Sequence, residues 1–152
     1  MRRIAGTLLL GALVLCATAV AVAPARPFDE FGDIKCEDEM ARLDNFAVQL
    51  QNEPQAKGVI IFYGGRIFRG KLPRRGDAEA RAARLKPYLV RRRGIPANQV
   101  ILINGGYAEE WRAILWLVPP GASLPSTYST VPAGQMRFRK GKTKPGDYRC
   151  RI

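Results

Sequence analysis

Arginine and glycine are concentrated in residues 64–76, a composition typical of a site for anions. The segment contains Gly64, Gly65, Arg66, Arg69, Gly70, Lys71, Arg74, Arg75 and Gly76. An arginine binds a carboxylate or phosphate through two parallel hydrogen bonds, and glycine lets a ligand approach the backbone closely. A second glycine pair, Gly105-Gly106, follows a later apolar run.

These residues are expected to meet at one edge of a sheet. Each glycine pair follows a predicted strand, and ligands of α/β sheets collect beyond the carboxyl ends of parallel strands. A helix predicted to begin at Asp77 would direct the positive end of its dipole to the same place. The sequence therefore predicts an anion site made of Gly65, Gly105, Arg66, Arg74, Arg75 and Arg81. The alternative is that the glycines only form turns and the arginines are a solvated surface.

No set of catalytic residues stands out. The chain has no histidine, and its serines at 123, 126 and 129 lie in a proline-rich segment without an evident base. The glycine-rich segment lacks the Gly-Lys-Ser/Thr of a nucleotide-binding loop. The acidic run Glu37-Asp38-Glu39 falls in the first turn of a predicted helix, where negative charge complements the dipole, so we interpret it as helix chemistry rather than a metal site. We expect no enzymatic activity, no cofactor and no metal.

Apolar periodicity predicts the elements that would position the anion site. β-Branched and aromatic runs at 58–63, 99–104 and 112–118 predict strands. Apolar residues at three- and four-residue spacing predict helices over 37–52 and 77–93. A strand, a crossover helix and another apolar strand form a βαβ unit, so the first two strands should be parallel. The short connection to the third strand favours an antiparallel hairpin between the second and third.

Several single residues and segments carry further expectations. Pro87 lacks a donor and should kink or interrupt the second helix, and Asp77 should cap that helix. A short first strand is expected within 26–35, and the alternation at 136–140 predicts an edge strand. Four prolines within 119–134 predict a linker or extended arm without its own core.

The N-terminus has the pattern of an export signal. Met1-Arg2-Arg3 precedes an apolar run over 4–23, and small residues follow. We expect cleavage near 23–25 and a periplasmic or secreted protein, which argues against a nucleic-acid partner. The alternative is a permanent anchor, because about 20 apolar residues just span a bilayer. Membrane contact is expected only through such an uncleaved N-terminus.

The two cysteines beyond the signal agree with export. Cys36 and Cys150 lie near opposite ends of the remaining chain. An even pair in an oxidising compartment predicts a disulfide, which would close a long loop and stabilise the fold by about 4–5 kcal/mol in the chain-entropy model. The alternative is two buried free thiols.

The charge is unevenly distributed. The formal net charge is +12, and removal of the signal lowers it to +10 because Arg2 and Arg3 are the only charges there. Acidic residues dominate 29–53, whereas basic residues dominate 57–93 and the tail after Gly134. Such asymmetry indicates an anionic partner or a polarised surface.

Residues 81–97 contain three short motifs in order: Arg81-Ala82, Tyr88-Leu89, and Gly94-Ile95-Pro96-Ala97 leading into a strand. They resemble the Arg-Ala, Tyr-Leu and Gly-Ile pattern of the peptidoglycan-associating, OmpA-like domain. The similarity covers roughly residues 35–118.

The resemblance implies a fold and a ligand. It implies an α+β or α/β two-layer sandwich, with a mixed sheet of about four strands, two helices on one face and the order βαβαββ. In the family, the arginine of Arg-Ala grips a diaminopimelate carboxylate of peptidoglycan, and that position here is Arg81. The family's partner aspartate is replaced by Gly65, and its Asn, Leu and Ser positions hold Arg74, Asp77 and Ala78.

The sequence therefore leads to one organisation and two functional hypotheses. We expect a signal at 1–25, an OmpA-like domain at 26–118, a linker at 119–134 and a basic tail at 135–152 tied back by the disulfide. In the first hypothesis, the protein binds peptidoglycan or another anionic envelope polymer through Arg81 and the arginine-rich segment. In the alternative, it is a structural or protein-interaction domain that has kept the fold and lost the ligand.

Overall fold

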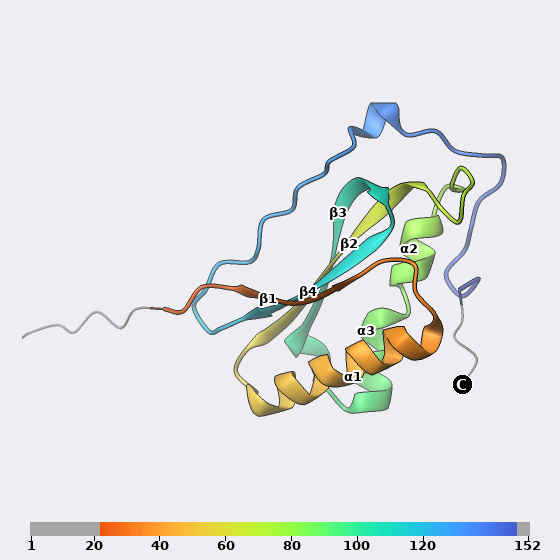
Figure 1. Ribbon diagram of the computed structural model, residues 1–152. Coiled ribbons are helices and arrows are strands. Elements are labelled where there is room, and N and C mark those ends of the chain that lie inside the picture. The colour runs from red at the N-terminus through yellow and green to blue at the C-terminus, as the bar shows by residue number, and fades with distance from the viewer. Residues whose placement is uncertain (1–21, 149–152) are drawn as a thin grey trace, which may run out of the picture.

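The computed structural model describes residues 22–148 (Figure 1). Its main elements are β1 (Arg26–Phe31), α1 (Cys36–Asn52), β2 (Lys57–Ile67), α2 (Asp77–Ala82), α3 (Leu85–Pro87), β3 (Val100–Glu110) and β4 (Arg112–Val118). A π-helical turn at Tyr88–Arg92 continues α3, and short 3-10 turns lie at Ala97–Gln99 and Ala133–Gln135. Most of the predicted signal and Cys150 lie outside the described residues, so cleavage and the disulfide stay predictions.

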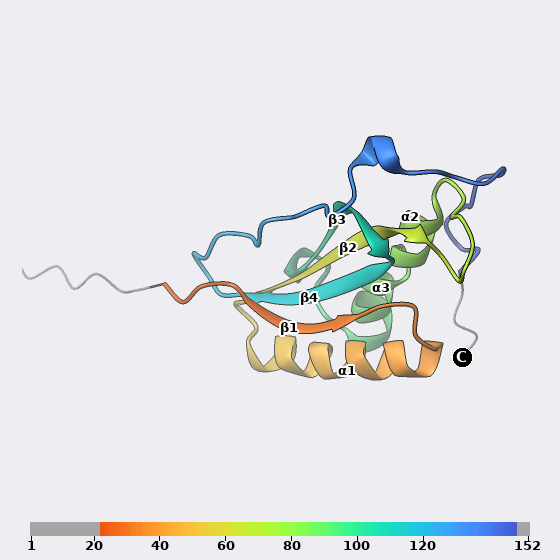
Figure 2. The same cartoon turned by 45° about the horizontal axis from the view of Figure 1, so that its top comes forward.

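The predicted two-layer fold is confirmed. The four strands form one mixed sheet in the order β1-β4-β2-β3, with β2 parallel to β3 and antiparallel to β4. In the view of Figure 2, α1 lies below the sheet, and α2 and α3 lie behind its strands. Within residues 22–148, no helix is long and apolar enough to cross a bilayer.

Two apolar clusters, one on each face of the sheet, explain why successive residues of β2 are apolar. Ile60 and Phe62 face the helices and belong to the main core with Leu43 and Leu85. Their neighbours Val59, Ile61 and Tyr63 face the other side, in a smaller cluster with residues of β3 and β4. Because successive side chains of a strand point to opposite faces, a strand buried on both sides needs apolar residues at every position.

The predicted hairpin between the last two strands is wrong. β4 pairs with β2 and β1, and only Trp111 separates the end of β3 from the start of β4. The pairing of β2 with β3 shifts between Phe62–Asn104 and Gly64–Tyr107. Gly105 and Gly106 thus form a β-bulge, and bulges bend and twist a strand. β3 continues to pair with β2 beyond the bulge as far as Glu110. The chain then crosses β2 at Trp111, where Gly65 leaves room for the backbone, and β4 joins the sheet on the other side of β2.

The second helix is interrupted, as Pro87 predicted. α2 ends at Ala82, α3 begins at Leu85, and the segment closes with the π-helical turn. Pro87 has no N–H to bond the Ala83 carbonyl, so the helical hydrogen-bond pattern fails at that turn. Gly94, at φ 71°, ends the segment in the left-handed conformation that favours glycine.

The last thirty described residues form an arm rather than a strand. Figure 1 shows this blue segment leaving β4, crossing near the ends of β3 and β2, and returning beside α2. The arm is attached by the N–H groups of Thr130 and Val131, which both donate to the Tyr107 carbonyl at 2.9 and 3.1 Å. The edge strand predicted at 136–140 is wrong, because this stretch bonds a loop and not the sheet: Arg139 N–H donates to the Pro73 carbonyl at 2.9 Å.

Candidate functional site

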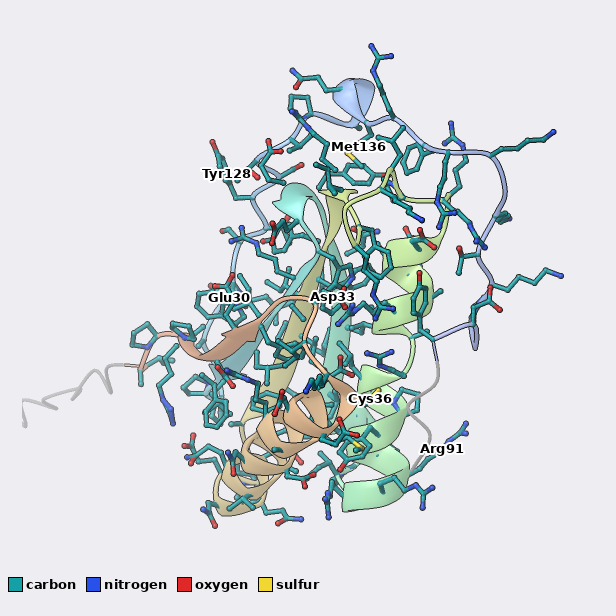
Figure 3. All side chains as sticks on the ribbon, turned by 45° about the vertical axis from the view of Figure 1, so that its right-hand side comes forward. Glu30, Asp33, Cys36, Arg91, Tyr128 and Met136 are labelled. Atoms are coloured by element: carbon teal, nitrogen blue, oxygen red, sulfur yellow. The ribbon has the colours of Figure 1, made fainter. Side chains whose placement is uncertain are left out.

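Arg81 lies inside the protein. Only 1% of it is exposed, although it carries a full guanidinium group. Its Nη1 forms an ion pair with Asp33, and its Nη2 donates to the Gly32 carbonyl at 3.3 Å and lies 3.8 Å from Glu39. The guanidinium carbon lies 4.2 Å from the centre of the Trp111 ring (Figure 3 labels Asp33 beside α2).

The surroundings of Arg81 show that it is buried and takes part in an internal ion pair. Burial, followed by the neighbouring Arg84 charge, lowers the pKa of Arg81 to about 10, so it remains a cation at neutral pH. A buried cation is tolerated only when it is paired, and Asp33 and Glu39 meet that need. The expected direct contact between Arg81 and a ligand is therefore not supported by this geometry.

The acidic segment neutralises much of the basic one. Arg84 binds Glu39 through two hydrogen bonds of 2.7 and 2.6 Å. Arg93 pairs with Asp44, while Arg69 binds Asp33 at 2.9 Å. The charge asymmetry that predicted an anionic partner is thus partly explained by internal ion pairs between residues 33–44 and residues 69–93.

Eight cations without an acidic partner among residues 22–148 lie on the loop after β2 and on the arm, and we call this region the basic end. It consists of Lys71, Arg74, Arg75, Arg137, Arg139, Lys140, Lys142 and Lys144. The loop and the arm that carry these side chains are held together by backbone bonds: Thr143 N–H donates to the Arg75 carbonyl at 2.9 Å, and Arg75 and Lys142 form a β-bridge. Among residues 22–148, none of the eight has an acidic partner within 4.0 Å.

Asp77 fastens the arm to the loop instead of capping α2. Its carboxylate accepts from the Arg74 N–H at 2.6 Å, from the Tyr148 hydroxyl at 3.1 Å and from the Thr143 hydroxyl. The predicted cap is wrong: the cap position is Gly76, and no side chain caps the helix. With six residues and a carboxylate at its start, α2 does not supply the predicted anion-attracting terminus.

A pocket of about 200 Å³ lies at the basic end, beside Arg74 and Arg75. Its walls include four aromatic rings, from Phe68, Tyr107, Trp111 and Phe138. Arg74 and Arg75 line it as cations, and Asp77 and Glu79 line it as acids. Met136, labelled in Figure 3, contributes to the same lining from the arm.

The structure brings together only part of the predicted anion site. Gly65 lines the pocket with Arg74 and Arg75, and a side chain there would come 2.5 Å from the Trp111 backbone nitrogen. Gly105 is buried under the Tyr63 ring on the other face of the sheet. Arg66 points elsewhere as well, bonding Gln135 at 3.0 Å and lying 3.5 Å from Glu109.

Sequence reasoning missed the aromatic walls and the contribution of the arm. Phe138 stacks under Arg75, whose guanidinium carbon lies 4.7 Å from the ring centre, and its ring meets Tyr107 at 6.4 Å. The signal was present as an aromatic residue between arginines in Arg137-Phe138-Arg139, but alternation was interpreted as an edge strand. Nothing in local spacing indicates that this segment returns to the loop after β2.

No group of three or more His, Cys, Asp or Glu residues between 22 and 148 is arranged to hold a metal ion. Comparison of the chain with protein-family models and with curated proteins finds no match in either set. The residues of the basic end and their geometry therefore carry the evidence for a function.

Proposed function

We propose that this protein is an exported, non-catalytic component of the cell envelope that binds an anionic polymer through the basic end. Peptidoglycan, with its carboxylate-bearing stem peptides, is the first candidate. The observation that carries the proposal is that two distant basic segments lie side by side while their charges stay free of acidic partners within residues 22–148.

The arrangement suits a polymer rather than a single ion. The loop and the arm are bonded to each other and together carry eight cations, and such a concentration of like charge attracts a chain with repeated negative charges. The resemblance to the peptidoglycan-associating domain supports the same ligand class, and the N-terminal pattern supports export. The contact would differ from that of the family because Arg81 is buried and neutralised.

One observation favours the alternative, a structural or protein-interaction domain that has lost its ligand. The arginine that corresponds to the family's ligand-gripping residue is used internally, paired with Asp33 and lying near Glu39. If that residue was the whole of the site, then the fold has been kept without the function.

A sedimentation assay with purified peptidoglycan sacculi separates the two proposals. The exported protein should be retained at low salt, and Lys140→Gln with Lys142→Gln should weaken retention roughly tenfold, because each removes an exposed charge worth up to about 1 kcal/mol. The matched control is Arg91→Gln with Arg92→Gln, which removes two exposed charges near the end of the second helix. Figure 3 shows Arg91 at the opposite end of the molecule from Met136.

Each outcome decides something. Equal weakening by both double variants would mean nonspecific attraction to the net charge, and no retention of the unaltered protein would favour the alternative. If the Lys140→Gln, Lys142→Gln variant is retained as well as the unaltered protein, and heat-unfolded protein is not retained, then the folded protein binds the sacculi through another surface.

A further inference from the structure

We propose that the pocket in the basic end is a subsite for a single sugar ring that carries a carboxylate. This inference deepens the proposed function and rests on it, since such rings would be units of the bound polymer. It points to an anionic envelope polymer whose sugar rings themselves carry carboxylates, in place of the stem-peptide carboxylates of peptidoglycan. It assigns a ligand class to the pocket, which the charge of the basic end alone does not.

The walls of the pocket fit a ring. Phe68, Tyr107, Trp111 and Phe138 come from the loop after β2, from β3, from the joint before β4 and from the arm. The faces of such rings carry partial negative charge, and the C–H groups of a sugar ring pack against them. An aromatic wall also excludes water from polar contacts made beside it, which strengthens those contacts.

The volume limits the ligand to about one ring. The pocket holds about 200 Å³, whereas sites for drug-sized molecules measure about 300–1,000 Å³. A disaccharide would have to extend out of the pocket toward the cations of the basic end. That geometry is the one expected when a polymer inserts one unit and lays its neighbours on the surface.

The charges in the pocket select a carboxylate. Neither the Arg74 nor the Arg75 guanidinium donates a hydrogen bond to a residue of the described chain, so both are available. Of the two acids, Asp77 already accepts from three donors. Among residues 22–148, Glu79 accepts only from the Asn104 amide at 3.3 Å, so its other oxygen can accept from a sugar hydroxyl.

The site is held in place before any ligand arrives. Phe138 packs against Tyr107 and supports Arg75 from below, at 6.4 and 4.7 Å. The bond from the buried Thr143 to Asp77 anchors the arm that carries Phe138. A preorganised arginine loses less freedom on binding than a free surface side chain, so the pocket should bind more tightly than the surrounding cations.

The fluorescence of Trp111 reports binding directly because its indole lines the pocket. Trp116→Phe leaves Trp111 as the single reporter and removes no hydrogen bond, since Trp116 Nε1 has no partner within the described chain. The probes are glucuronate, glucose and acetate, which carry ring and carboxylate, ring alone and carboxylate alone. Glucuronate should bind with a dissociation constant of about 1 mM, as expected for a ligand of its size, and the other two at least tenfold more weakly.

Two variants test the assigned contacts against a matched control. Phe138→Leu keeps apolar bulk but removes the flat face, and Arg75→Gln removes the charge; each should weaken glucuronate binding at least fivefold. Arg91→Gln should leave it unchanged, and far-ultraviolet circular dichroism checks that all three are folded. Equal binding of acetate and glucuronate, or no effect of either pocket variant, would overturn the assignment.

The two proposals fail separately. Retention on sacculi without a glucuronate response would overturn the subsite and leave the polymer contact standing. A glucuronate response without retention would mean that the pocket binds a sugar acid but that the envelope role is wrong.

Discussion

Replacing Arg81 with alanine tests whether this arginine holds the fold together or holds a ligand. The structure makes it an internal residue: its side chain is 1% exposed and is paired with Asp33, whose side chain is 28% exposed. Glu39, with a 2% exposed side chain, lies 3.8 Å away, and Trp111 packs against the guanidinium. The variant therefore removes one cation from a buried cluster and leaves its acids behind.

The expected loss of stability is about 3 kcal/mol. Removing one partner of a buried ion pair costs about 3–5 kcal/mol, because the remaining charge is left uncompensated. Here the lower end applies, since Glu39 keeps Arg84 at 2.6 Å and Asp33 keeps Arg69 at 2.9 Å. A domain of this size loses about 3–5 °C of melting temperature per kcal/mol, so the midpoint should fall by roughly 10–15 °C.

Thermal and urea unfolding followed by circular dichroism measure this loss. Arg74→Ala is the matched control, because it removes an exposed arginine from the neighbouring loop and should change stability by less than about 0.5 kcal/mol. Arg81→Lys keeps the charge but not the planar fork, so it should recover only part of the stability.

One result would contradict a structural role for Arg81. If Arg81→Ala unfolds at the same temperature as the unaltered protein but is no longer retained on sacculi, then Arg81 is a ligand residue and the buried geometry is wrong. If Arg81→Ala does not fold at all, the partly stable Arg81→Lys still allows retention to be compared below its melting temperature.

Three further predictions concern the arm and the titrating groups. Thr143→Val should loosen the arm, because it removes a hydrogen bond to the Asp77 carboxylate worth about 1.5–3 kcal/mol, and limited trypsin digestion should then cut after Lys140 or Lys142 sooner. Burial, and next the Asp77 charge, raise the pKa of Tyr148, so its contribution to stability is present below pH 10 and is lost as the pH rises through the higher folded value; Tyr148→Phe should remove one late step from the ultraviolet titration of tyrosine. Hydrogen bonds from Arg26 and then Gln49 lower the pKa of Glu53 below 4.5, so its contribution is present above pH 4.5 and is lost as the pH falls through the lower folded value; Glu53→Gln should make acid unfolding less steep.

Each of these three has a contradicting result. Unchanged digestion of Thr143→Val would mean that other contacts hold the arm. A normal titration of all tyrosines, or an acid limb that Glu53→Gln leaves as steep as before, would show that the corresponding contact does not form in solution.

The layout of the fold was accessible from local patterns. Apolar runs predicted β2, β3 and β4, the three- and four-residue spacing predicted α1, and Pro87 predicted the interruption of the second helix. These features depend on neighbours a few residues apart, and the period of a strand or helix is visible at that range. The partners of β4 were not accessible, because they depend on competition between whole strands that lie far apart in the sequence.

Some features of the candidate site were likewise accessible from local sequence, and others were not. Local sequence is enough to place arginines and glycines after β2, to show that Gly65 permits a close backbone approach, and to show that the arm is rich in cations. Which cations stay available to a ligand depends on how the chain packs in three dimensions. Arg81 and Asp33 are 48 residues apart, and Arg75 and Phe138 are 63 apart, so no local spacing relates them. Whether a charge is neutralised inside the protein or presented to a ligand depends on which faces of distant segments meet, and packing of the whole chain sets that.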